Sequence, residues 1–191
     1  MTDSPKRVLY VIGCGARPTA DIPDFVTWAQ RLGWDVCVIL TPKGRQFTET
    51  DRLAKVTGHP VRSEYKHPDE PDVLPWPPDA FVVAPATFNT INKWAAGISD
   101  TLVLGLLNEG LGLDVPMIAV PNPNMALARH PAFLQSVESL RSWGVRVMFD
   151  PARFPLPKSV PGETSRSLFP WEALREEFVD ASRGLSGRAT G

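Results

Sequence analysis

The stretch that decides the fold is Val8-Leu9-Tyr10-Val11-Ile12-Gly13-Cys14-Gly15, close to the start of the chain. Its first five residues form an unbroken apolar run, which is typical of a parallel strand that is covered on both faces. The run ends in two glycines around a cysteine, and small residues of this kind predict a tight turn. The stretch therefore indicates a buried first strand whose carboxyl end opens into a turn.

Short apolar runs of the same kind recur along the chain and alternate with amphipathic stretches. The predicted later strands span residues 35–40, 80–84, 116–120 and 145–149. The predicted helices span residues 21–32, a mixed stretch between Gly44 and Gly58, residues 131–140 and residues 169–182. The first has Asp21 as its N-cap and Pro23 in its first turn, and it ends at Gly33. Gly144 closes the helix at 131–140. Strands that alternate with helices need crossover connections, and these make the sheet parallel. We predict an α/β fold, a three-layer doubly wound parallel sheet of the Rossmann-like or flavodoxin-like kind.

The length and composition limit the classes of protein to consider. A chain of 191 residues suits one domain, which we place at residues 1–150. Residues 151–191 are expected to form a Pro-rich loop, a C-terminal helix and a disordered tail from Gly184 onward. Lys and Arg (20) nearly balance Asp and Glu (21), so no excess positive charge is present to attract nucleic acid or a membrane. With a polar start and no long apolar run, the chain is expected to be cytoplasmic.

The two cysteines, Cys14 and Cys37, lie within or beside apolar runs. Two such residues are too few for a disulfide framework or a zinc cluster. We predict two thiols in the core and no metal site.

Ligands of doubly wound sheets bind outside the carboxyl ends of the strands, so the residues that follow each strand are the informative ones. The first strand is followed by the small residues Gly15 and Ala16, and the second by Thr41. The third is followed by 85–90 (PATFNT), which places hydroxyl and amide groups at a helix start. Asn122 and Asn124 follow the fourth strand on a Pro-rich turn. Each segment alone is also compatible with an ordinary turn or helix cap.

Two of these segments resemble the signatures of a known family. Residues 84–104 (APATFNTINKWAAGISDTLVL) resemble the flavin-binding segment of the homo-oligomeric flavin-containing cysteine decarboxylases, which include phosphopantothenoylcysteine decarboxylase and the lantibiotic decarboxylases. Residues 121–128 (PNPNMALA) are similar to the second signature, P-x-M-N-x-x-M-W, and 57–61 (TGHPV) match the family's usual text after its second helix. The chain is thereby identified as a divergent member, with the resemblance running from about residue 7 to residue 150.

The resemblance implies an FMN cofactor and a set of site residues. Gly15, Ala16, Thr41 and Thr90 would hold the phosphate region, and Thr87, Phe88 and Asn89 would line the ribityl chain and the flavin ring. Asn124 would bind the substrate carboxylate. Hydroxyl groups and helix-start amides can bind a phosphate without Lys or Arg. In the family, the flavin takes a hydride from a cysteinyl side chain, and carbon dioxide leaves from the resulting thioaldehyde.

The chain departs from the family at its catalytic histidine. The family places this residue eight positions before the aspartate that precedes the third strand, and counting back from Asp79 gives Pro71. His67 lies four residues earlier in a polar loop and is the displaced candidate for the catalytic role, beside the alternative that it is a solvated loop histidine. Arg129 and His130 form another polar pair near the expected substrate position, or else an exposed helix start.

The second signature and the segment after it also differ from the family. Pro123, Leu127 and Ala128 replace its two methionines and its aromatic residue, and residues 151–169 replace the substrate-clamp loop.

Three functions stay open at this point. The first is an FMN-dependent lyase that decarboxylates a cysteine-like or other small carboxylated substrate, either a small molecule or a peptide. The second is a flavin-binding redox or regulatory protein without decarboxylase activity, and the third is a nucleotide-binding α/β module that shares only the architecture. The resemblance also implies a homo-oligomer, with a trimer as the expected form.

Overall fold

The computed structural model describes residues 6–158 and 168–184. Within them the strands form one parallel sheet in the order β2-β1-β3-β4-β5. The strands are β1 (Val8–Gly13), β2 (Asp35–Leu40), β3 (Ala80–Ala86), β4 (Met117–Pro121) and β5 (Arg146–Val147). The chain moves outward from β1 in both directions, so β1 and β3 flank the point at which the strand order reverses. This arrangement confirms the predicted doubly wound α/β fold and marks the crevice at which such sheets bind ligands.

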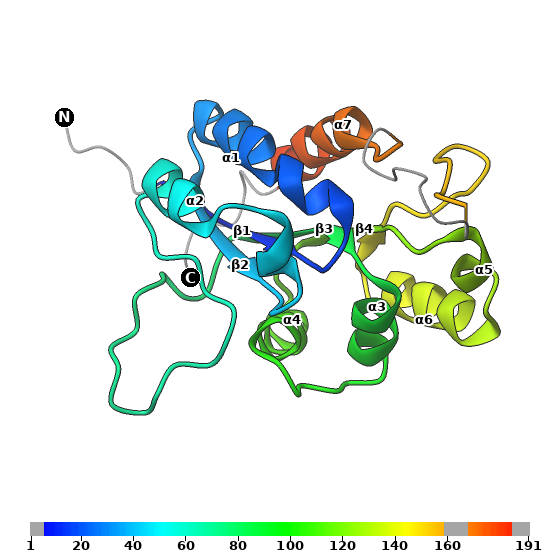
Figure 1. Cartoon of the computed structure of the whole chain (residues 1–191), viewed down its shortest axis with the longest axis horizontal. Helices are drawn as coiled ribbons and strands as arrows, with labels where there is room; N and C mark the ends of the chain where they lie inside the picture. Colours follow the sequence, from blue (N-terminus) through cyan, green and yellow to red (C-terminus); the bar gives the residue numbers. More distant parts are fainter. Residues whose placement is uncertain (1–5, 159–167, 185–191) are drawn as a thin grey trace.

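Helices cover both faces of the sheet. They are η1 (Arg17–Asp21), α1 (Ile22–Arg31), η2 (Gly44–Phe47), α2 (Thr50–Thr57), α3 (Phe88–Ala95), α4 (Leu102–Gly112), α5 (Met125–Ala128), α6 (Pro131–Ser142) and α7 (Trp171–Arg183). Figure 1 shows α1 and α7 on one side of the sheet and α3, α4 and α6 on the other.

Side chains that alternate along the strands divide the core into two layers. Tyr10 of β1 packs in the layer that contains Phe133 of α6, whereas its neighbour Leu9 packs in the layer that contains Phe25 and Phe178. All of these side chains are at most 2% exposed. Because both faces of each central strand are covered, the strands are continuous apolar runs in the sequence.

Helix α1 begins and ends where the sequence predicts. Asp21 occupies the N-cap position and Pro23 lies in the first turn, although the Asp21 side chain makes no cap hydrogen bond. Gly33 follows the helix with φ of 89°, a left-handed conformation that glycine adopts without steric cost. Cys14 and Cys37 are both fully buried free thiols, as predicted.

The edge strand β5 is shorter than the five residues predicted at 145–149. Met148 N still donates to Ala119 O at 2.8 Å, but the guanidinium of Arg141 donates to the carbonyl oxygens of Val147 and Phe149. These bonds use carbonyl groups on the open side of the strand. We infer that they turn the chain away from the sheet after Val147.

The C-terminal helix α7 packs on the layer that contains α1. The Phe178 ring lies within 5.2–6.2 Å, between centroids, of the rings of Phe25, Trp28 and Trp34. The predicted amphipathic helix therefore docks on its own sheet. The domain boundary at residue 150 stays a prediction, and most of the predicted disordered tail, residues 185–191, lies outside the described residues. No helix in the described ranges is long and apolar enough to cross a membrane.

Candidate functional site

The segments that follow β1, β2 and β3 are hydrogen-bonded to one another at the carboxyl edge of the sheet. Cys14 N donates to Pro85 O at 3.1 Å, and Thr41 N donates to Gly13 O at 3.0 Å. The turn after β1 is therefore held between the ends of β2 and β3. This is the place where the strand order reverses, and doubly wound sheets bind their ligands there.

A cavity of about 510 Å³ opens beside these three strand ends, and we call it the strand-end cavity. Its volume falls within the range of about 300–1,000 Å³ that is usual for small-molecule sites. Its lining residues come from the three strand ends and from α3 and α4: Gly15, Thr41, Pro42, Lys43, Gln46, Phe47, Thr87, Asn89, Thr90, Lys93, Thr101, Val103 and Leu104. They include hydroxyl groups, amides, two lysines and apolar side chains, and no Asp or Glu.

A hydroxyl network connects the turn after β1 to the start of α3. Thr87 is the N-cap of α3, and its Oγ1 accepts from Thr90 N at 3.4 Å and lies 2.9 Å from Thr90 Oγ1. Thr90 Oγ1 in turn donates to Cys14 Sγ at 3.3 Å. Burial raises the pKa of the Cys14 thiol. Cys14 therefore stays a neutral hydrogen-bond partner that orients Thr90.

The loop after β2 packs directly on the turn after β1. Thr41 Oγ1 accepts from Gly44 N at 3.0 Å, so the hydroxyl proton of Thr41 is free to donate to a ligand. An ideal Cβ built on Gly15 would lie 2.7 Å from Lys43 Cβ, and one built on Gly44 would lie 2.5 Å from Gly13 O. Glycine at both positions permits this close approach of the two backbones.

Most of the predicted cofactor-binding residues line the strand-end cavity, and two do not. Gly15, Thr41, Thr87, Asn89 and Thr90 are lining residues. Ala16 instead precedes η1, and its N donates to Cys14 O at 2.8 Å. Phe88 points into the neighbouring layer, where its ring stacks on Phe133 with centroids 5.7 Å apart.

Two lysines of the cavity were missed by the sequence analysis. Lys43 lies two residues after Thr41, and Lys93 lies one helical turn after Asn89. The second had a signal in the sequence, because residues four apart share a helix face. The position of Lys43 depends on the path of a loop, which no periodicity in the sequence predicts.

Two side chains after β4 cap helices: Asn124 is the N-cap of α5, and His130 is the N-cap of α6. Asn124 Oδ1 accepts from Leu127 N at 2.9 Å at the start of α5, which leaves the Nδ2 amide as a hydrogen-bond donor. His130 Nδ1 accepts from Ala132 N at 3.2 Å at the start of α6, so its proton resides on Nε2. The His130 ring lies edge-on to Phe88, with centroids 5.7 Å apart. These side chains and the exposed Arg129 follow β4 at the carboxyl edge, and none of them lines the strand-end cavity.

His67 and Pro71 lie in the loop between α2 and β3, which projects at the lower left of Figure 1. The His67 side chain is 70% exposed, and its Nδ1 lies 3.3 Å from Asp69 Oδ2. Neither residue lines the strand-end cavity. Among the residues that the structure describes, no histidine lines the strand-end cavity.

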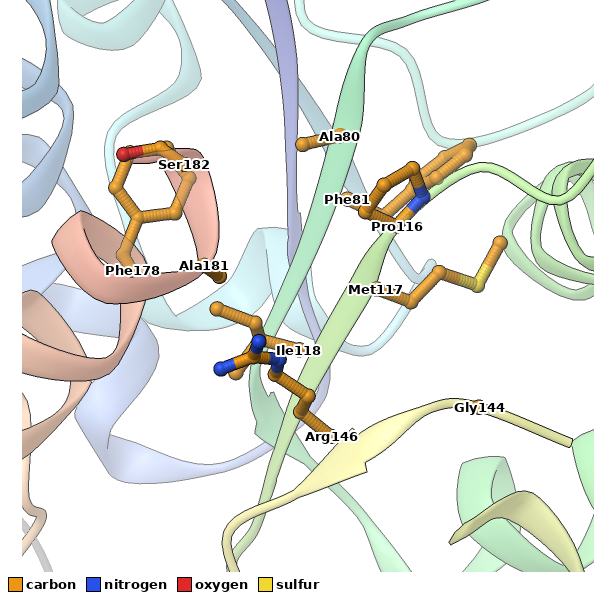
Figure 2. A pocket seen from close by; sticks show the side chains of 10 residues that line it. All are labelled: Ala80, Phe81, Pro116, Met117, Ile118, Gly144, Arg146, Phe178, Ala181 and Ser182. Carbon is orange, nitrogen blue, oxygen red and sulfur yellow. The ribbon is translucent and has the colours of Figure 1, made fainter. Parts of the chain in front are cut away.

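A second hollow lies at the opposite, amino end of the strands. Figure 2 shows the starts of β3 and β4 on one side and Phe178, Ala181 and Ser182 of α7 on the other. Its volume is about 50 Å³, which is far below that of a small-molecule site. Arg146 at its edge pairs with Glu177 at 2.7 Å and Asp180 at 3.4 Å. This hollow is a packing gap beneath α7.

In the described residues, no cluster of three or more His, Cys, Asp or Glu side chains is arranged to hold a metal ion.

Comparisons with known proteins place this geometry in context. A family model described as "Flavoprotein" matches residues 1–177. A probable phosphopantothenoylcysteine decarboxylase from Streptococcus mutans is 28% identical over 148 residues, which are 74% of this chain and 80% of the relative. A cysteine/cysteine sulfinic acid decarboxylase from an unknown prokaryotic organism is 31% identical over 130 residues, 65% of this chain and 34% of that protein.

Solved structures share the fold. The FMN-dependent cysteine decarboxylase TvaF from thioviridamide biosynthesis superposes with a TM-score of 0.71 at 24% identity, covering 95% of this chain and 99% of the other. The FMN-dependent cysteine decarboxylase SpaF gives a TM-score of 0.70 at 22% identity, with coverage of 94% and 98%. At these identities the superpositions bear on the fold alone.

Proposed function

Because the chain belongs to the flavoprotein family, we propose that it binds FMN in the strand-end cavity and uses it to decarboxylate a cysteine-like or other small carboxylated substrate. The observation that carries the proposal is the composition of this cavity. Hydroxyl groups from the ends of β2 and β3 and from the start of α4 face a common space together with two lysines, and the lining contains no carboxylate. Such a lining suits an anionic ligand that also carries an apolar ring.

The residues present fit the parts of FMN. Thr41, Thr87 and Thr90 offer hydroxyl groups to a phosphate and to the hydroxylated chain next to it. Val103 and Leu104, at the start of α4, offer apolar contact to a ring system. Gly15, in the turn after β1, lines the same space, and phosphate sites commonly lie at small-residue turns of this kind.

FMN, when bound, supplies a two-electron acceptor, and the chain must orient a substrate next to it. Asn124 is the residue that we assign to the substrate carboxylate, because its Oδ1 is engaged with Leu127 N and its Nδ2 is left to donate. His130 Nε2–H is a second donor after the same strand. Both side chains are fixed by their capping hydrogen bonds, which lowers the entropy cost of binding a carboxylate.

The missing histidine favours a second candidate function. Pro71 holds the position that the sequence analysis assigned to the catalytic histidine, and His67 is exposed to solvent. A chain whose cofactor cavity has no histidine among its described lining residues would be a flavin-binding redox or regulatory protein.

Two measurements test the proposal and separate the candidates. The purified full-length chain, titrated with FMN, is expected to bind it with quenching of flavin fluorescence and to show a flavin absorption spectrum. Binding of an adenine nucleotide in its place would contradict the cofactor assignment. Incubation of the FMN-bound protein with cysteinyl peptides, followed by mass spectrometry for loss of carbon dioxide and two hydrogens, tests the reaction.

The variant Asn124→Asp is the sharpest probe of the substrate assignment. Aspartate keeps the oxygen that caps α5 and is itself a good N-cap, so the helix is expected to survive. It replaces the amide donor by a negative charge, which repels a substrate carboxylate. We expect unchanged FMN affinity and a fall in decarboxylation of about 100-fold or more, from the loss of a charge-assisted hydrogen bond combined with repulsion. Normal turnover would rule out this role for Asn124.

The oligomeric state and the location stay predictions. A homotrimer is proposed from the sequence resemblance, and light scattering on the purified protein tests it. A cytoplasmic location is proposed because the sequence has no long apolar run, and cell fractionation tests it.

A further inference from the structure

Lys43 lies where the loop after β2 meets the turn after β1. The close approach of its Cβ to Gly15 fixes the start of its side chain beside the first strand end. Lys43 and Gly15 both line the strand-end cavity. The lysine therefore belongs to the end of the cavity at which β1 and β2 meet.

The two lysines of the cavity differ in their ion pairing. Lys93 Nζ lies 2.5 Å from Asp100 Oδ2, so a carboxylate already balances its charge. Lys43 makes no ion pair with any of the residues that the structure describes, and its side chain is exposed. Because no Asp or Glu lines the cavity, the Lys43 end carries an unbalanced positive charge.

Neutral hydroxyl groups line the same cavity as Lys43. The Thr41 hydroxyl proton is free because its oxygen accepts from Gly44 N. Across the cavity, Thr90 is held by its bonds to Thr87 and Cys14. A lysine without an ion pair, next to neutral hydroxyl groups, is a good receptor for a phosphate, which carries about −1.5 to −2 charges at neutral pH.

We propose that Lys43 binds the phosphate of the flavin and gives the site its selectivity for FMN over riboflavin. This inference rests on the proposed function, and it replaces the expectation that neutral groups alone hold the phosphate. Riboflavin has the same ring and ribityl chain but no phosphate, so it would gain nothing from Lys43. Removing one charge-assisted contact is expected to cost FMN about 10- to 100-fold in affinity.

The experiment compares the two flavins on the full-length chain after removal of any bound flavin. Fluorescence titrations with FMN and with riboflavin are measured for the wild type, Lys43→Ala and Lys43→Arg. Alanine retains the Cβ that packs on Gly15, so the loop contact is preserved while the charge is removed. Lys55→Ala is the matched control, because Lys55 is an exposed lysine on α2 that does not line the cavity.

Lys43→Ala is expected to lose FMN affinity and to keep riboflavin affinity, whereas Lys43→Arg and Lys55→Ala stay close to the wild type. Added salt should weaken FMN binding to the wild type more than to Lys43→Ala, since salt screens a charged contact. An unchanged ratio of FMN to riboflavin affinity in Lys43→Ala would overturn the inference and leave FMN binding itself established. A wild type that binds neither flavin would overturn the proposed function, and this inference with it.

Discussion

Replacing Gly15 by alanine tests whether the close contact between two strand-end loops shapes the cofactor site. The added Cβ would lie 2.7 Å from Lys43 Cβ, whereas non-bonded carbon atoms prefer about 3.5–4.0 Å. Rotation of the lysine side chain cannot relieve the contact, because Cβ is attached directly to the backbone. The loop of residues 41–44 must therefore move by roughly 1 Å to restore a normal separation.

The rest of the structure resists that movement. Thr41 N donates to Gly13 O at 3.0 Å, and Gly44 packs against the same carbonyl group. Overpacking of this kind costs about 1–3 kcal/mol. If the unliganded protein retains the strain, Tm falls by about 2–12 °C for a chain of this size. If the loop relaxes and FMN must draw it back, the same free energy appears as a loss of affinity of about 5- to 150-fold.

Calorimetry measures the loss of stability, and flavin titration measures the loss of FMN binding free energy. The two losses should add up to about 1–3 kcal/mol. Gly112→Ala is the matched control, because a Cβ on Gly112 would meet no atom within 4 Å. On α4, alanine is expected to leave Tm unchanged or to raise it slightly, since alanine favours the helix. If Gly15→Ala matches Gly112→Ala in both Tm and FMN affinity, the reasoning about the loop contact is refuted.

Three further predictions address other parts of the molecule. Phe178→Ala should lower the free energy of unfolding, measured by urea titration, by about 3–5 kcal/mol. The reason is that the Phe178 ring is only 2% exposed and packs against three other aromatic rings. An unaltered urea midpoint would mean that α7 does not stabilise the sheet. Burial raises the pKa of Cys37 from 9.0 to about 12, with a contribution from the charge of Asp35. The contribution of the neutral Cys37 thiol to the free energy of unfolding is therefore complete below pH 9 and is lost as pH rises toward 12. In Cys37→Ser, the free energy of unfolding should depend less on pH in this range. A pH profile identical to that of the wild type would contradict the assignment. His67→Gln should keep FMN affinity within about twofold of the wild type, because the His67 side chain is 70% exposed and does not line the cavity; a larger loss in titration would place His67 at the cofactor.

The sequence was sufficient to predict the sheet because each central strand is an apolar run that ends at a turn residue. The run at 8–12 and the turn at Gly13 to Gly15 appear in the structure as β1 and the turn after it. The exception was the edge strand β5, where the hydrogen bonds from Arg141 decide how far the strand extends. A contact between a helix side chain and a distant strand leaves no periodic signal in the sequence.

The candidate site was predictable where a strand end fixes the position of a residue, as for Thr41 and Thr87. It was less predictable within the first turn of α3, where successive residues point about 100° apart. Phe88 consequently packs on Phe133, although Thr87 and Asn89 on either side of it line the cavity. The sequence places all three in one signature, and only the helix geometry separates them.

The residues proposed to bind the cofactor and those proposed to bind the substrate lie on different elements, and this separation would let one set diverge without the other. Thr41, Lys43 and Thr87 follow β2 and β3, whereas Asn124 and His130 follow β4 and lie outside the cavity. Changes near Asn124, such as the loss of the family's methionine at Pro123, therefore leave the packing of Gly15 on Lys43 untouched. On this argument, variants after β4 should change turnover at constant FMN affinity, and variants at 41–44 should change FMN affinity first.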